Sequence, residues 1–294
     1  MRATNRFSKI STVVAVALAL SAAGCGKKKA KPTGAAGSAA GSTEGSTAGS
    51  AGSNAGSAKP APVIRSVTPQ EAVDAPERTA EDKALDAGRK PVELITFLGV
   101  GRGMKAAELF AGGGYTSELL ARVVGPEGVV YAQNSKDILE KFAEKPWSER
   151  LARVKMPWLV RVDRELNDPL PEEAKDLDIV VLNLVYHDTV WLGVDRTAMN
   201  GAVWKALRPG GMYAIIDHSA KDGTGADAAK DLHRIEAAFV QKEVEASGFA
   251  LDHTSTMYAN PADTRDWNAS PTAAADKRGT TDRFVLVFRK QTGK

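Results

Sequence analysis

The stretch that decides the fold is residues 106–124, AAELFAGGGYTSELLARVV. Ala106–Phe110 is a short apolar run typical of a buried strand, and Thr116–Val124 has the apolar spacing of a helix. The three glycines between them, Gly112–Gly114, let the backbone turn tightly and approach a ligand with no Cβ in the way. Amides at the start of the following helix would point at such a ligand. The stretch predicts a strand–loop–helix unit, whose loop is either a ligand-binding turn or a plain tight turn.

The rest of the folded part repeats this alternation of strand and helix. Six more strands are expected, at Val129–Ala132, Trp158–Val162, Asp178–Leu184, Met212–Ile216, Leu251–Met257 and Phe284–Phe288. Helices are expected from Thr79 to Lys90, from Pro91 to Leu98, from about Ser135, over Ala198–Leu207 and over Leu232–Ser247.

Alternation of this kind indicates a parallel sheet with helices on both faces. The last two strands have no helix between them, so they must turn back antiparallel. The expected fold class is α/β, a doubly wound, Rossmann-like seven-stranded sheet with a C-terminal antiparallel hairpin.

Charge and cysteine content exclude several classes of protein. The 294 residues carry a net charge of +3, but residues 63–294 hold 31 basic and 35 acidic side chains, a net charge of −4. A basic nucleic-acid-binding domain is therefore disfavoured, and no nucleic-acid partner is expected. A single cysteine excludes a disulfide framework and a Cys-rich zinc site. Beyond the N-terminus no apolar run reaches the ~18 residues that span a bilayer, which excludes a polytopic membrane protein.

Residues 1–24 have the order of a secretory signal. Three basic side chains precede the apolar run Ile10–Leu20, and the small residues Ser21–Gly24 lead into Cys25. The ending resembles a bacterial lipobox, whose cysteine is acylated and becomes the mature N-terminus, although Ala22 stands where that pattern prefers leucine. An uncleaved apolar anchor and an ordinary signal peptide are the alternatives.

Residues 25–62 are predicted to be the lipidated Cys25 followed by a disordered tether. Four lysines follow the cysteine closely, where they could meet anionic lipid headgroups, and 21 of the 25 residues from Gly34 to Ala58 are Gly, Ala or Ser. Such a segment cannot bury enough apolar surface to offset its ordering entropy. The resemblance to lipoproteins, with Gly26 after the cysteine, implies a membrane-anchored protein of the cell envelope. It would face the periplasm and be held in the bilayer by acylated Cys25, in the outer rather than the inner membrane.

Two common nucleotide-binding loops fit the glycines poorly. The pattern G-x-G-x-x-G fails because Ser117 occupies the third glycine position. The acidic residue expected ~20 positions later is also missing, since Gln133 and Asn134 stand there. No Gly-Lys-Ser/Thr follows the loop, which excludes a Walker loop.

Several motifs in this order resemble the class I S-adenosylmethionine (SAM) dependent methyltransferases, and more narrowly a group of predicted bacterial methyltransferases. They are Arg89-Lys-Pro91, Glu108 with Gly112–Thr116, Asp178–Leu184 running into Tyr186-His-Asp188, Leu207–Gly211, Asp217-His218 and Arg278–Phe284. The resemblance covers about residues 80–290. It implies that residues 63–294 form a methyltransferase-like domain with the class I fold and that SAM is the cofactor.

The resemblance also implies which residues bind the cofactor. They are Glu108, Ala111, Gly112, Gly113, Gly114, Tyr115, Asn134, Asp163, Asn183 and Leu184. Glu108 would orient the loop or meet the amino group of SAM, and the glycines would pack against its methionyl part. Asn134 stands where the family normally holds the ribose hydroxyls with a carboxylate, and a neutral amide is a weaker acceptor. Asp163 would lie on the adenine side, with Arg164 as an alternative register.

Four polar residues at neighbouring strand ends are the candidate catalytic residues: His187, Asp188, Asp217 and His218. Methyl transfer is an in-line displacement at the methyl carbon of the sulfonium, so positioning of the two reactants supplies most of the catalysis. The resemblance implies that Asn183 and Leu184 lie beside the sulfonium. A base is needed only where the acceptor must lose a proton, and the ordinary pKa of His187 suits that role. Alternatively, His187 and His218 are polar caps that bond to the backbone at strand ends. Zinc binding by His187, His218 and an aspartate is a further alternative, but no close ligand spacing supports it, so no metal site is expected.

The sequence therefore predicts a SAM-dependent methyltransferase at the cell envelope that acts on an unidentified acceptor, with no protein partner specified. The alternatives are a lipoprotein that binds a small ligand without turnover and one that uses the fold as a scaffold. An exported enzyme would need SAM outside the cytoplasm, which favours the alternatives. Open space beside Gly112 would favour cofactor or ligand binding, whereas space filled by Phe110, Tyr115 or Trp158 would favour a scaffold.

Overall fold

The computed structural model describes residues 65–291. The predicted signal peptide, the lipidation site Cys25 and the predicted tether lie outside this range. Within residues 65–291, no helix has the length and the apolar character needed to span a bilayer.

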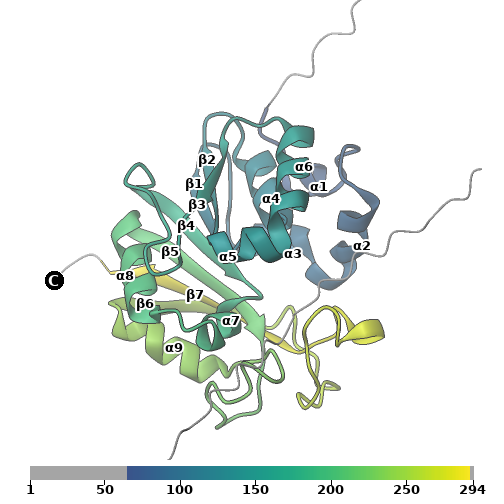
Figure 1. Ribbon diagram of the computed structural model, residues 1–294. Coiled ribbons are helices and arrows are strands. Elements are labelled where there is room, and N and C mark those ends of the chain that lie inside the picture. The colour runs from purple at the N-terminus through teal and green to yellow at the C-terminus, as the bar shows by residue number, and fades with distance from the viewer. Residues whose placement is uncertain (1–64, 292–294) are drawn as a thin grey trace, which may run out of the picture. The chain divides into compact units, whose positions relative to one another are not determined.

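The described chain is built on one seven-stranded sheet, in the order β3–β2–β1–β4–β5–β7–β6 (Figure 1). The strands are β1 (Lys105–Leu109), β2 (Val129–Asn134), β3 (Leu159–Asp163), β4 (Leu177–Asn183), β5 (Leu207–His218), β6 (Phe249–Ser255) and β7 (Arg283–Lys290). The pairs among β1–β5 are parallel, β7 runs antiparallel to β5, and β6 runs antiparallel to β7. The predicted fold class is confirmed. The C-terminal pair is joined by the long connection 256–282, and β7 lies between β5 and β6.

Helices cover both faces of the sheet (Figure 1). The helices are α1 (Pro69–Val73), α2 (Ala80–Arg89), α3 (Pro91–Phe97), α4 (Tyr115–Val124), α5 (Lys136–Ile138), the π-helix η1 (Leu139–Ala143), α6 (Glu144–Val154), α7 (Tyr186–Trp191), α8 (Arg196–Ala206), α9 (Ala237–Ala246) and the 3₁₀ turn η2 (Ala275–Lys277). α3, α4 and α6 contribute to one buried cluster, whereas α8 and α9 contribute to a second cluster on the other face.

One helix is shorter than its sequence predicts. A helix was expected over Leu232–Ser247, but α9 begins only at Ala237. The preceding residues pair instead with the end of β5: the Ile235 amide donates to the His218 carbonyl at 2.9 Å, and Ser219 and Ile235 form a β-bridge. Because these amides bond to the sheet, the chain does not turn into a helix there.

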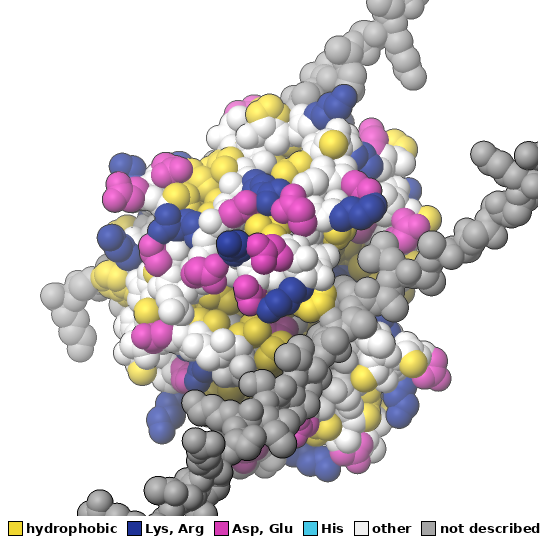
Figure 2. All heavy atoms as spheres, viewed as in Figure 1, with side chains coloured by type: hydrophobic (Ala, Val, Ile, Leu, Met, Phe, Trp, Pro, Cys, Tyr) yellow, Lys and Arg dark blue, Asp and Glu magenta, His cyan; other side chains and the backbone are white. Residues whose placement is uncertain are grey.

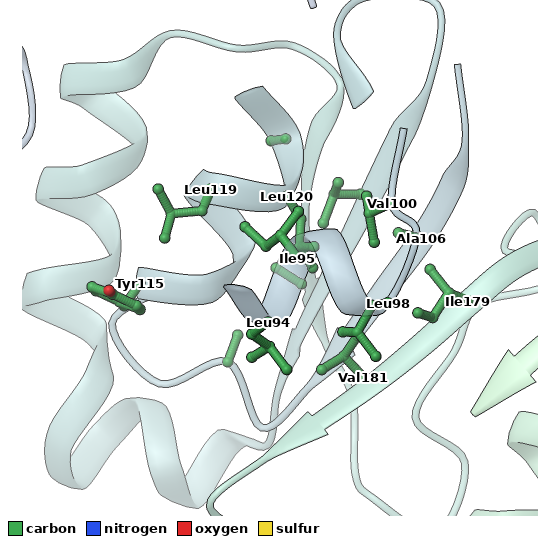
Figure 3. Close-up of a cluster of buried hydrophobic side chains, with 14 of the residues drawn as sticks. Leu94, Ile95, Leu98, Val100, Ala106, Tyr115, Leu119, Leu120, Ile179 and Val181 are labelled. Atoms are coloured by element: carbon green, nitrogen blue, oxygen red, sulfur yellow. The ribbon is translucent and has the colours of Figure 1, made fainter. Parts of the chain in front are cut away.

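A cluster of buried hydrophobic side chains packs together the helices around the glycine loop. Leu94 and Ile95 of α3, Leu98 directly after this helix, and Leu119 and Leu120 of α4 are all buried in one cluster (Figure 3). Full burial of one such leucine stabilises the fold by roughly 1.5–3 kcal/mol. This contact holds the α2–α3 corner against the start of α4, where the glycine loop ends.

The face shown in Figure 2 carries charges of both signs. Lys and Arg side chains alternate there with Asp and Glu, and apolar side chains lie between them. Many of these charges are paired along the helices, as in the exposed pair of Lys141 with Asp137 at 2.7 Å. Such exposed pairs contribute at most about 1 kcal/mol each.

Candidate functional site

The order of the sheet points to one edge as the place for a ligand. From β1 the chain moves outward through β2 and β3, then crosses back to β4 and β5 on the other side. In open α/β sheets, ligands bind beyond the carboxyl ends of the strands at such a reversal. The glycine loop follows β1, and residues 184–188 follow β4, so both lie at this edge.

The two outer glycines of the loop have different surroundings. Gly112 and Gly114 both have left-handed backbones, with φ of 56° and 78°. A Cβ on Gly112 would have no atom within 4 Å, whereas one on Gly114 would overlap the ring of Trp147. Gly112 therefore leaves open space over the loop, and Gly114 lets Trp147 of α6 pack closely against it.

The amide side chains at the end of β2 hold the loop in place. Asn134 accepts a hydrogen bond from the Gly112 amide at 2.8 Å and donates to the Gly112 carbonyl at 3.0 Å. Gln133 accepts from the Phe110 amide at 2.9 Å. Both side chains are buried. The residue assigned to the ribose by resemblance thus bonds the loop main chain.

Glu108 anchors the first turn of α4 to β1. Its carboxyl is buried and accepts a hydrogen bond from the Ser117 hydroxyl. Burial raises the pKa of Glu108 from its ordinary 4.5 to about 7, although the hydrogen bonds from Ser117 and Thr116 oppose the shift. Of the two roles implied by the resemblance, these contacts fit orientation of the loop.

Arg89, which the sequence placed in a motif but not in the site, lies over the start of α4. Its guanidinium is 4.6 Å from the centre of the Tyr115 ring, and the Tyr115 hydroxyl donates to Asp86 at 2.5 Å. Within residues 65–291 the Arg89 side chain has no ion pair, and burial lowers its pKa. No carboxylate in this part of the chain lies within ion-pair distance of this guanidinium, although the buried Glu108 attracts it from further away, so Arg89 is suited to an anionic group of a ligand.

The other residues assigned to the cofactor lie in the glycine loop, at the end of the central strand β4 and at the end of the edge strand β3. The Ala111 amide donates to the Gln133 carbonyl, and the Gly113 carbonyl accepts from Arg150. Asn183 donates to the Thr116 hydroxyl at 3.3 Å and so lies at the start of α4, whereas Leu184 has a left-handed φ of 65° and its amide donates to the Ile216 carbonyl of β5 at 2.7 Å. Asp163 is exposed at the end of β3, two strands from β1, and pairs with Arg161 at 2.8 Å.

The candidate catalytic residues come together at the ends of β4 and β5. Nδ1 of His187 donates to Asp217 at 2.7 Å, and the His187 amide donates to the same carboxylate at 2.8 Å. Burial alone would lower the pKa of His187, but the carboxylates of Asp217 and Asp188 outweigh it and raise the pKa to about 10. His187 is then protonated at neutral pH, and an imidazolium cannot accept a proton.

His233 is a member of this group that the sequence did not reveal. Its Nδ1 is 3.2 Å from Nε2 of His187 and 3.3 Å from Oδ1 of Asp188. Nε2 of His187 is 3.2 Å from the same Asp188 oxygen, so the three atoms form a nearly regular triangle. His233 is 46 residues after His187, and no spacing rule links the two.

His218 lies next to the triangle but is not part of it. Its Nδ1 is 2.8 Å from the Thr281 hydroxyl, and its ring centre is 5.8 Å from that of His187. Burial lowers the pKa of His218 well below its ordinary value, so this ring is neutral. The partner of this ring is thus a side-chain hydroxyl rather than the backbone.

Neither a protein-family model nor a curated protein matches this sequence. Solved structures do match. A SAM-dependent methyltransferase from Aquifex aeolicus is similar, with a TM-score of 0.50, 14% identity and coverage of 76% of this chain and 99% of that one. A chain of the complex between the Trm112 methyltransferase activator and a methyltransferase from Haloferax volcanii has a TM-score of 0.51, 14% identity and coverage of 78% and 100%.

The order of the strands and the antiparallel β7 are shared with these structures. The fold is that of the class I methyltransferases. In this fold the loop after β1 has open space at Gly112, Arg89 lies over Tyr115 at the start of α4, and the end of β2 carries the amide Asn134 in place of a carboxylate. Two surface cavities of about 310 and 290 Å³ lie elsewhere, the first against η1 and α6 and the second on the connection 256–282.

Proposed function

We propose that the protein is a SAM-dependent methyltransferase. The observation that carries the proposal is the Arg89 guanidinium, which forms no ion pair within residues 65–291 and lies over the ring of Tyr115, the first residue of α4 after the glycine loop. Arginine binds carboxylates in a bidentate fashion, so Arg89 would hold the methionyl carboxylate. Bound SAM supplies a methyl group on a sulfonium.

The chain's own contribution to such a reaction is positioning. Asn183 bonds to Thr116 at the start of α4, and Leu184 follows it at the end of β4, three residues before His187. Alignment of acceptor and sulfonium can supply much of the barrier reduction, up to roughly 7–11 kcal/mol in well-oriented systems.

Titration calorimetry tests the proposal directly. SAM and S-adenosylhomocysteine are titrated into the purified full chain, into Arg89→Gln and into a matched control, Arg102→Gln, whose arginine pairs with Glu127 on the exposed surface. We expect binding by the parent protein, a loss of about tenfold or more in Arg89→Gln, and no change in the control. Absence of binding at millimolar ligand would overturn the proposal.

One observation favours a second function. Asn134, at the ribose position, is committed to the loop main chain through both of its side-chain hydrogen bonds. A protein that keeps the fold but binds another small ligand, or uses the fold as a scaffold, needs no ribose carboxylate. Calorimetry separates this alternative from the methyltransferase, because it predicts no SAM binding.

We further propose that the protein is a lipoprotein of the cell envelope, anchored through acylated Cys25 and facing the periplasm, with the outer membrane favoured. The support is the order of basic, apolar and small residues before the single cysteine. Methyl transfer there would depend on SAM outside the cytoplasm. Fractionation of a Cys25→Ser variant tests the anchor.

A further inference from the structure

We propose that His187, Asp188 and His233 bind one divalent transition-metal ion of the zinc type. The sequence led us to expect no metal site, and the tertiary structure brings in the third ligand. The inference is independent of the proposed SAM binding and goes beyond it.

The first support is the geometry of the three ligand atoms. His187 Nε2, Asp188 Oδ1 and His233 Nδ1 are separated by 3.2, 3.2 and 3.3 Å. A tetrahedral zinc ion with bonds of ~2.0–2.1 Å holds its ligands ~3.3–3.4 Å apart. The triangle thus matches one face of such a tetrahedron, with a small outward movement of each side chain, and leaves the fourth position for water or an acceptor atom.

The second support is the orientation of the first histidine. Nδ1 of His187 donates to Asp217, so the lone pair of its Nε2 faces the triangle once no proton is held there. A carboxylate on the far nitrogen is the usual partner of a metal-binding histidine. Asp188 is oriented as well, because the Trp191 indole donates to its Oδ1 at 3.0 Å.

The third support is charge. The group contains two carboxylates, Asp188 and Asp217, and within residues 65–291 neither forms an ion pair with a lysine or an arginine. Two neutral imidazoles, two carboxylates and one divalent cation give a neutral site. Because their only ion-pair partners in residues 65–291 are histidines, these carboxylates are costly to bury once the histidines are neutral, so a cation there stabilises the fold.

The fourth support is that the third ligand is held in place and can be reached. His233 has a left-handed φ of 50°, and its neighbour Arg234 is fully buried and pairs with Asp263 at 2.9 Å. The side chains of His233 and Asp188 are 13% and 15% exposed to solvent, whereas that of His187 is 3% exposed. An ion can therefore enter from the side of His233 and Asp188.

The ligand atoms select the type of metal. Two imidazole nitrogens and one carboxylate suit zinc, cobalt, nickel, copper or iron, whereas magnesium and calcium prefer all-oxygen sites. The distances of 3.2–3.3 Å between the three ligand atoms favour a four-coordinate ion.

The experiment uses the full chain, freed of metal with a chelator and titrated with Zn²⁺ in the absence of SAM. We expect one equivalent to bind and to raise the melting temperature. His233→Ala and Asp188→Asn should weaken binding about 100-fold, and Asp217→Asn about 10–100-fold. His253→Ala is the matched control, because His253 pairs with Asp252 on β6, away from the group.

Co²⁺ provides a second measurement, since an intense visible absorption marks a four-coordinate site. No Zn²⁺ binding by the parent protein, or equal binding by His233→Ala and the parent, would overturn the proposal. Melting curves without metal show whether each variant is folded. Because no SAM is present, these results are independent of whether the protein binds SAM.

Discussion

At the scale of the residue, two glycines of one loop differ in how much room each leaves for a side chain. Gly114→Ala would place a methyl group inside the ring of Trp147 on a left-handed backbone, and we expect it to destabilise the fold by about 2–5 kcal/mol. Gly112→Ala meets no atom and should cost about 1–2 kcal/mol, through its backbone alone. Urea unfolding of both variants checks this order.

Calorimetry on the same two variants relates the loop to the cofactor. If SAM lies over Gly112, Gly112→Ala should weaken its binding about tenfold or more while the protein stays folded. Unchanged SAM affinity in a folded Gly112→Ala protein would place the cofactor elsewhere.

Glu108 makes stability depend on pH. Its pKa is about 7 in the folded protein against an ordinary 4.5, so its stabilising contribution is complete below about 4.5, falls as pH rises to about 7, and is constant above that. Glu108→Gln keeps an acceptor for Ser117 and removes the ionisation. Relative to the parent, it should gain about 2–3 kcal/mol of unfolding free energy between pH 5 and pH 8. Parallel pH profiles of the two proteins would contradict a raised pKa.

At the scale of the element, one buried ion pair links the segment 219–236 to the connection 256–282. Arg234 is fully buried, pairs with Asp263 and donates to the carbonyls of Ser219 and Trp267. Arg234→Met leaves Asp263 without its cation and should cost about 3–5 kcal/mol in urea unfolding. Arg208→Met is the control, because Arg208 pairs with Asp178 at the surface and its loss should cost no more than about 1 kcal/mol. Equal losses in the two variants would show that the buried pair does not hold the segment.

At the scale of the whole molecule, the expected location depends on one side chain outside residues 65–291. Cys25→Ser removes the only thiol that could be acylated. We expect the parent protein to sediment with membranes and the variant to appear in the soluble fraction, as followed by immunoblotting. A variant that stays with the membranes would show that Cys25 is not the anchor.

Local pattern was enough to predict most elements and the fold class. The alternation of short apolar runs with helical spacing, read from single segments, matched seven strands and most helices. The helix expected over Leu232–Ser247 was too long, because Ile235 bonds to the end of β5, and this contact is distant in sequence. The sequence predicted that the candidate site lies at the ends of β4 and β5, but it did not reveal that His233 meets His187 there.

The sequence by itself determined the order of strands and helices, the glycine loop and the uneven charge, because each depends on neighbouring residues. Only the tertiary structure showed that Asn134 bonds to Gly112, that Arg89 lies over Tyr115, and that His233 joins His187. The physical reason is that these contacts depend on how the sheet is ordered and where the connecting loops pass. Burial and hydrogen bonding over the whole domain decide both, and no spacing along the chain encodes them.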